Sequence, residues 1–169
     1  MSLSVKKLHP DASLPKYAKQ GDSGFDLVAV EDVIIEPGET KLIKTGLAFE
    51  IPKGYEIQVR PRSGITLKTK LRVQLGTVDS NYRGEVGVIV DNTYHVYLDD
   101  GDFLYKPWTI AEEVASNAEH NIYGTYLIRK GDRIAQAVLA PVAYTEFVEV
   151  DELSETERGV NGYGSTGIN

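Results

Sequence analysis

Residues 55–60 read Tyr-Glu-Ile-Gln-Val-Arg, so apolar and polar side chains alternate along the whole segment. A period of two is typical of a β-strand with one buried and one solvated face. The same period, or a short apolar run that indicates a more buried strand, recurs at residues 41–45, 47–51, 86–90, 134–139 and 147–150. Turn signals rich in Gly, Pro and Asp separate these segments, at residues 36–39, 52–54, 99–102 and 130–132. Many short strands separated by such turns predict an all-β fold, an antiparallel barrel or jelly roll.

The composition is that of an ordinary globular domain. The chain has 169 residues, of which 41% are hydrophobic, enough for one domain with a hydrophobic core. Its apolar runs are far shorter than the roughly 20 residues that cross a bilayer. The first residues, Met1 to Lys6, lack the apolar core of a signal peptide, so the expected location is the cytoplasm.

The composition also excludes several kinds of site. The chain has no cysteine, which rules out disulfides, thiolate metal sites and the Cys ligands of zinc-dependent nucleobase deaminases. The three histidines, His9, His95 and His120, are scattered and have no metal-ligand spacing. A net charge of −7 disfavours nonspecific binding to a nucleic-acid backbone. An anionic substrate therefore needs a local cluster of cationic and backbone N–H groups, together with a metal ion.

Residues 93–125 form an irregular stretch with one predicted helix. Thr109 followed by Glu112 makes a capping box, and Ile110, Val114 and nearby alanines then fall on one helical face. The strands on either side are complete without this stretch, which therefore has the character of an insertion.

The C-terminal residues differ from the rest of the chain. Residues 158–167 are rich in glycine and offer little apolar surface, so they cannot pack a core by themselves. We therefore divide the chain into a barrel domain at 1–157 and an arm at 158–169 that is mobile when free. Backbone N–H groups and hydroxyls in this arm suit phosphate oxygens, and Tyr163 lies between two glycines, where a core role is excluded.

Two earlier segments suit a nucleotide. Residues 60–64 read Arg-Pro-Arg-Ser-Gly and combine guanidinium, hydroxyl and open backbone N–H groups, a set that binds phosphate oxygens. Residues 76–84 read Gly-Thr-Val-Asp-Ser-Asn-Tyr-Arg-Gly and predict a hairpin loop. In that loop the backbone edge can bind a base, Asp79 can serve as a general base, and Tyr82 can lie against a sugar. Taken singly, each segment is also typical of an ordinary polar turn.

Two more segments carry polar side chains beside apolar strand starts. Residues 21–27 place Asp26 there, and residues 130–136 place Gln136 after the turn signal Gly131-Asp132. Alone, each is equally typical of a simple Asp/Gly turn.

In this order the five segments resemble the five motifs of the trimeric dUTPase family, and they span Gly21 to Gly167, nearly the whole chain. The most specific matches are Pro61–Gly64, Asp79–Gly84, Gly131–Gln136 and Gly162–Gly167. The resemblance implies a jelly roll whose three subunits build three shared active sites, with the arm of one subunit closing over the site of another. It also implies Mg²⁺-dependent hydrolysis of dUTP to dUMP and pyrophosphate, which limits uracil incorporation into DNA.

The resemblance assigns roles on the nucleoside side of the site. Asp79 would orient and deprotonate the attacking water, and the Tyr82 ring would leave no space for a 2′-hydroxyl. The backbone around Leu75 and Gly76 would read the imide edge of uracil, and Tyr163 of the arm would stack on it.

Further roles concern the triphosphate. Phosphate oxygens would be held by four residues of the barrel: Arg62, Ser63, Gly64 and Gln136. The substrate itself would hold most of the Mg²⁺ coordination, with Asp26 contacting a metal-bound water. In the arm, Arg158 would act on the γ-phosphate in the manner of an arginine finger. The γ-phosphate would be capped by Ser165, Thr166 and Gly167.

The chain departs from the family pattern in three places. Residues 158–162 are less uniformly small than is common, and Tyr163 replaces the commoner Phe. The stretch 93–125 is much longer than the usual connection between the third and fourth motifs, and it is similar to inserts in dUTPases of bacteriophages of Gram-positive bacteria. Some of those enzymes also bind a repressor protein, and here the aromatic residues suit an interface: Tyr94, Tyr97, Phe103, Tyr105, Trp108 and Tyr123. The alternative is that these rings pack the insertion onto its own barrel.

Two other functions remain open at this point. A dCTP deaminase shares the fold but places a glutamate on the strand after the hairpin, where residues 87–90 here read Gly-Val-Ile-Val. A regulatory protein that mainly titrates a repressor is the other alternative, and it is compatible with hydrolysis because every catalytic position is filled.

Overall fold

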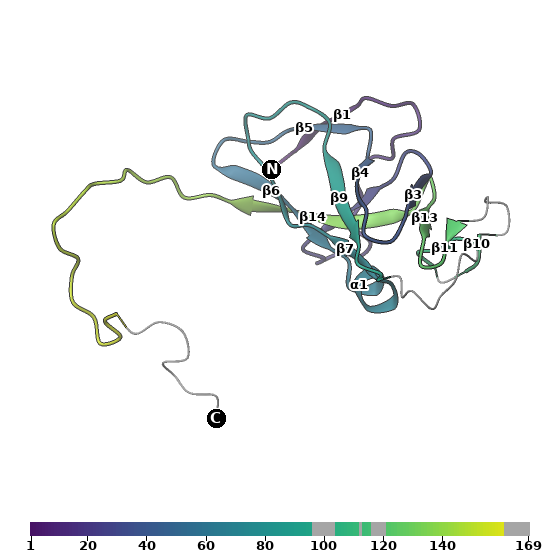
Figure 1. Ribbon diagram of the computed structural model, residues 1–169. Helices are drawn as coiled ribbons and strands as arrows, with labels where there is room; N and C mark the ends of the chain where they lie inside the picture. Colours follow the sequence, from purple (N-terminus) through teal and green to yellow (C-terminus); the bar gives the residue numbers. More distant parts are fainter. Residues whose placement is uncertain (96–103, 112, 116–120, 161–169) are drawn as a thin grey trace.

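The computed structural model describes residues 1–95, 104–111, 113–115 and 121–160, and these residues form almost entirely β-structure (Figure 1). The elements in chain order are β1 (Ser4–Lys7), β2 (Phe25–Val28), β3 (Val33–Ile35), β4 (Thr40–Lys44), β5 (Leu47–Glu50), β6 (Tyr55–Pro61), α1 (Ser63–Lys68), β7 (Leu71–Val73), β8 (Gly76–Val78), β9 (Gly87–Asn92), β10 (Leu104–Tyr105), β11 (Trp108–Thr109), β12 (Asn121–Ile122), β13 (Tyr126–Ile128) and β14 (Arg133–Pro141).

Two antiparallel sheets supply most of the core. One has the strand order β2-β14-β6-β8, and the other has the order β4-β9-β7. Ile57 of β6 and Val88 of β9 are fully buried members of one continuous apolar cluster. Burial of this cluster is the main force that holds the two sheets together. The predicted all-β jelly roll is confirmed.

The alternation that predicted β6 is confirmed side chain by side chain. Ile57 and Val59 are buried in the core, whereas Arg60 is exposed. The apolar run at 86–90 behaves differently from the prediction of a buried strand, because Ile89 is 47% exposed. It lies opposite Leu42 of β4 on the outer face of its sheet, so only every second residue of β9 reaches the core.

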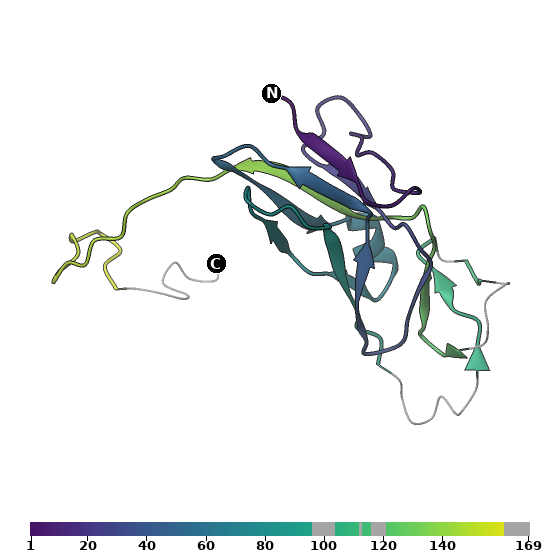
Figure 2. The ribbon, with the colours of Figure 1, turned by 90° about the horizontal axis from the view of Figure 1, so that it is seen from above.

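No strand forms at residues 147–150, contrary to the prediction. β14 ends at Pro141, and the chain then leads away from the barrel (Figures 1 and 2). Phe147 is 95% exposed, and within the described chain no strand pairs with this segment. Alternating side chains are insufficient here, because a strand also needs a neighbour for its backbone N–H and C=O groups.

The helix predicted at Thr109 is also wrong in position. Among the described residues α1 is the one helix. It is too short to cross a membrane. Thr109 instead belongs to β11, which pairs in parallel with β13. Its Oγ1 accepts a hydrogen bond from the backbone N of Glu113 at 3.2 Å, and Trp108 bridges Val114. Hydrogen bonds to a neighbouring strand have replaced the local helical ones; Glu112 and Ala118 lie outside the described residues.

A buried asparagine fastens the insertion to the barrel. Asn92 Nδ2 donates to the carbonyl oxygens of Ile35 at 3.0 Å and Gly124 at 2.8 Å, and its Oδ1 accepts from the Tyr94 backbone N at 3.0 Å. The Tyr94 and Tyr123 rings meet edge to face, with centroids 5.5 Å apart. Three of the six aromatic residues, Tyr94, Tyr105 and Tyr123, therefore pack against one another within the stretch 93–125, whereas Tyr97 and Phe103 lie outside the described residues.

We expect Asn92→Ala to lower the free energy of unfolding by about 2–4 kcal/mol, because two buried carbonyls and one N–H lose their partner. Urea denaturation measures the change. The control is Thr40→Ala, which removes an exposed hydrogen bond from Thr40 Oγ1 to Asp91 Oδ1 (2.7 Å) and should cost about 1 kcal/mol or less. Equal losses in the two variants would contradict the anchoring role of Asn92.

Candidate active site

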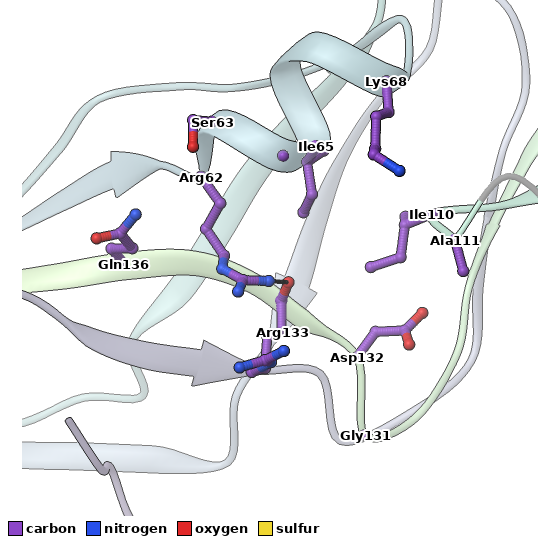
Figure 3. Close-up of a pocket in the computed structure, with 11 residues that line it drawn as sticks. Arg62, Ser63, Ile65, Lys68, Ile110, Ala111, Gly131, Asp132, Arg133 and Gln136 are labelled. Carbon is purple, nitrogen blue, oxygen red and sulfur yellow. Dashed lines mark hydrogen bonds between the residues drawn. The ribbon is translucent and has the colours of Figure 1, made fainter. Parts of the chain in front are cut away.

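A surface cavity of about 390 Å³ brings together two of the five polar segments (Figure 3). Arg62, Ser63 and Gly64 reach it from the end of β6 and the start of α1, and Gln136 reaches it from β14. Asp26, from a third segment, lies beside it on β2. The four predicted phosphate-binding residues of the barrel are therefore neighbours.

Strand register explains why these distant residues meet. Gln136 on β14 is paired with Asp26 of β2 on one side and with Arg60 of β6 on the other. Gly24, just before β2, gives the Gln136 side chain its space, since a Cβ at residue 24 would lie 3.1 Å from Gln136 Oε1. The adjacent strands thus align the first, second and fourth motifs at one edge of the sheet.

The charges near the cavity favour an anion. Asp26 forms ion pairs with Arg62 Nε at 3.2 Å and with Arg133 Nη1 at 3.3 Å. Arg62 Nη1 also donates to the Arg133 carbonyl oxygen at 2.9 Å, the bond drawn in Figure 3. Two guanidinium groups around one carboxylate leave a local positive charge, to which Lys68 in the cavity wall adds. Arginine forks of this kind suit phosphate oxygens.

The cavity also contains residues that the sequence reasoning did not single out. Asp132 and Arg133 lie inside the segment 130–136, which the sequence pattern had already indicated, but no role was predicted for either side chain. Ile110 and Ala111 of the insertion form part of the wall, across from Ile65 in Figure 3. No local pattern marks those two residues, because their place depends on how the insertion packs.

Among the described residues that line this cavity, Asp132 is the one with a carboxylate side chain. Burial raises the pKa of its carboxyl above the usual value of 3.8, although the group accepts a hydrogen bond from the Arg129 backbone N at 2.8 Å. A raised folded-state pKa means that ionisation of Asp132 opposes folding.

The stability that Asp132 contributes should therefore be present below pH 3.8 and be lost as the pH rises through its folded-state pKa. We expect Asp132→Asn to melt at a higher temperature than the wild type at pH 7, since the amide keeps the acceptor and removes the charge. The difference should shrink on acidification toward pH 3.8. Thermal melts across this pH range test the sign, and a lower melting temperature for the variant at pH 7 would contradict it.

The predicted catalytic hairpin lies elsewhere on the same chain. Val78 of β8 pairs with Ile57, so Asp79 lies level with Glu56, six residues along the chain from Arg62. At about 3.3 Å per residue, Asp79 and Arg62 are separated by roughly 20 Å along the sheet. None of the residues of the hairpin, including Leu75, Gly76 and Tyr82, lines the cavity. One copy of the chain thus holds the two halves of the predicted site apart.

The arm residues divide between described and undescribed parts of the chain. Arg158 lies exposed near the end of the described segment, well after the end of β14 at Pro141. The other predicted arm residues lie outside the described residues: Tyr163, Ser165, Thr166 and Gly167. In the part of the chain that the structure describes, no cluster of three or more His, Asp or Glu side chains could hold a metal ion.

Comparison with known proteins agrees with this geometry. The sequence model of the dUTPase family matches residues 10–102 and 119–167. The deoxyuridine 5'-triphosphate nucleotidohydrolase of Nautilia profundicola is 47% identical over 169 residues, and that of Helicobacter pylori strain J99 is 40% identical over 170 residues; each alignment covers at least 98% of both chains. The dUTPase of Staphylococcus bacteriophage 80alpha with dUpNHpp superposes with a TM-score of 0.91 at 35% identity, covering 99% of each chain. The dUTPase of phage phi11 of S. aureus gives a TM-score of 0.86 at 31% identity, covering 92% of this chain and 100% of that one.

A jelly roll with an arginine-lined cavity at the ends of its strands defines a class of proteins that bind a phosphorylated ligand. Within that class the chain belongs to the dUTPase family, as the ordered motifs predicted, and its activity is the hydrolysis of dUTP. The family match settles the choice against the deaminase.

The comparisons also delimit the insertion. The family match leaves residues 103–118 out, so the insertion is the central part of the stretch expected at 93–125. The phage structures align across nearly the whole chain, and so do bacterial relatives of almost the same length. Phage and bacterial members of the family therefore share a chain of about this length, including the stretch that contains the insertion.

Proposed function

We propose that three copies of the chain share three sites, in which Mg²⁺-bound dUTP is attacked by water at the α-phosphorus to give dUMP and pyrophosphate. The observation that supports sharing is the distance of roughly 20 Å between Asp79 and Arg62 along one sheet. A second copy that presents its hairpin to the cavity of the first would complete the site.

On the phosphate side, Arg62, Ser63, Gly64 and Gln136 hold phosphate oxygens in the cavity. Asp26 is held between two arginines, and its carboxylate oxygens suit water molecules bound to Mg²⁺. The metal, when bound to the triphosphate, neutralises charge on the departing pyrophosphate. The arrangement positions the triphosphate and stabilises charge without covalent catalysis.

On the nucleoside side, Asp79 takes the proton from the attacking water. Tyr82 packs against the deoxyribose and excludes a 2′-hydroxyl, while the backbone at Leu75 and Gly76 hydrogen-bonds the imide edge of uracil. Asp79 and Tyr82 are both exposed at the hairpin tip, where a ligand held by another copy can reach them.

The arm at 158–169 closes over the assembled site and the barrel domain at 1–157 carries the rest. Arg158 and the groups of Ser165, Thr166 and Gly167 contact the γ-phosphate, and Tyr163 stacks on uracil. The chain between Pro141 and Arg158 can extend over roughly 55 Å, which is long enough to reach the site of another copy.

Pyrophosphate release from dUTP, UTP, dCTP and dTTP tests the proposal, with Mg²⁺ and with the metal removed by a chelator. We expect turnover of dUTP alone, only with Mg²⁺, by a particle whose mass in solution is three times that of the chain. Turnover without the metal, equal turnover of UTP, or activity of a monomer would each overturn the corresponding part.

A second role is binding of a DNA-binding repressor through the insertion. The 80alpha relative is one of the phage dUTPases described as controlling transfer of virulence genes by a G protein-like mechanism. On this chain, apolar side chains remain partly exposed on or beside the insertion: Tyr105, Trp108, Val114 and Ile122. Substitution of the exposed Val114 and Ile122 by Glu should abolish release of a repressor from its operator DNA in a gel-shift assay while sparing dUTP hydrolysis, since neither residue lines the cavity. Release that survives both substitutions would refute this role.

A further inference from the structure

The Tyr82 side chain packs against the backbone of its own hairpin. A Cβ at Gly84 would lie 2.3 Å from the Tyr82 Oη and 2.5 Å from its Cζ, so the ring lies directly over residue 84. Gly84 is not among the glycines with positive φ, and its backbone is therefore open to any residue. A side chain at residue 84 would therefore displace the ring from this position.

The Tyr82 hydroxyl fixes the other end of the ring. It donates to the backbone carbonyl oxygen of Glu85 at 3.1 Å. The tip is also closed on itself, since the Tyr82 backbone N donates to the Asp79 carbonyl oxygen at 3.1 Å. The position of the ring thus depends on where the Glu85 carbonyl is held.

Glu85 is in turn fastened to the barrel by its side chain. Its Oε1 accepts a hydrogen bond from the Gly46 backbone N at 2.8 Å. Gly46 cannot shift easily: its φ is +66°, and a Cβ there would lie 2.8 Å from His9 Cβ and 2.9 Å from Ala12 Cβ. Val86, which follows Glu85, adds a second attachment, because its backbone N donates to the Leu47 carbonyl oxygen at 2.8 Å.

From these contacts we infer that Gly84 and Glu85 are positioning residues. They hold the Tyr82 ring where it excludes a 2′-hydroxyl on the sugar. The inference rests on the proposed role of Tyr82, and it adds that the position of the ring depends on the turn between β4 and β5. A ring that can retreat makes room for a 2′-hydroxyl, so loss of either contact relaxes the choice between dUTP and UTP.

Three variants of the full-length chain test this with Mg²⁺ present: Glu85→Ala, Glu85→Gln and Gly84→Ala. The readout is kcat/KM for dUTP divided by kcat/KM for UTP. We expect a roughly fivefold to tenfold fall in this ratio for Glu85→Ala, about the effect of losing one ordinary hydrogen bond. Glu85→Gln keeps an acceptor for the Gly46 N–H and should restore most of the ratio. Gly84→Ala keeps the hydrogen bond from the Gly46 N–H to the Glu85 side chain but displaces the Tyr82 ring, so it should lower the ratio at least as far.

The outcomes separate the inference from the proposed function. A purely structural role of Glu85 would lower both kcat/KM values in parallel and leave their ratio unchanged, and that result would overturn the inference. If Glu85→Ala fails to melt cooperatively, Gly84→Ala decides alone, with an unchanged ratio as the contrary result. A wild type that does not prefer dUTP to UTP would instead refute the proposed role of Tyr82 itself.

Discussion

Asp79→Asn is expected to lower the kcat for dUTP about a thousandfold while leaving folding and dUTP binding close to those of the wild type. An amide has nearly the same shape as the carboxylate but cannot take the proton of the attacking water, and general-base catalysis contributes roughly 10²–10⁴-fold. Within the hairpin Asp79 accepts a hydrogen bond from the Tyr82 backbone N through its backbone carbonyl, which the substitution retains.

Pyrophosphate release measures the loss, and calorimetric titration with a non-hydrolysable dUTP analogue measures binding. Glu31→Gln makes the same chemical change at an exposed residue that forms an ion pair with Lys44 at 3.7 Å, and it should retain full activity. Activity of Asp79→Asn within tenfold of the wild type would remove Asp79 from the role of base.

Removal of residues 158–169 is expected to lower dUTP hydrolysis by about a thousandfold or more. In the proposed mechanism the arm supplies Arg158 and groups that exclude water from the site, and an arginine finger alone can contribute roughly 10³-fold or more. Thermal stability should be unchanged, since the described chain beyond Pro141 is exposed and adds nothing to the core. Arg158→Ala in the full-length chain should reproduce part of the loss and so separate the guanidinium from the rest of the arm.

Mixing the truncated chain with Asp79→Asn decides whether the arm acts on another copy. Each variant alone is inactive, but a mixed trimer contains sites where Asp79 comes from one chain and the arm from the other. Partial recovery of activity after co-refolding is expected for an arm that acts in trans. No recovery in a confirmed mixed trimer would show that the arm serves the site containing its own Asp79.

Much of the barrel follows from the sequence because its side chains face either core or solvent. The alternation at 55–60 gave a correct strand, since Ile57 and Val59 have one packed face to occupy. The pattern failed where a partner decides the outcome. Residues 147–150 alternate but have no neighbouring strand in the described chain, and Thr109 pairs with Leu127 of β13 and hydrogen-bonds Glu113 instead of starting a helix.

The candidate site was predictable in composition and less so in arrangement. Gln136 and Arg62 were identified from local chemistry, and strand register brings them to one cavity. The separation of Asp79 from that cavity also depends on strand register, which pairs Val78 with Ile57. No local pattern in the sequence reveals this register. Ile110 could not be foreseen at the cavity, because the surface that an insertion contacts depends on tertiary packing.

The exit of the chain at Pro141 has a consequence for the speed of the enzyme. In the proposed mechanism the chain after Pro141 is a tether, which keeps the arm at an effective concentration on the order of millimolar around the sites it can reach. The arm therefore needs little intrinsic affinity for the bound nucleotide, and weak contacts suffice to keep it in place for much of the time. Weak contacts also break quickly, so a tethered arm can seal the site for each reaction and still let pyrophosphate escape without delay.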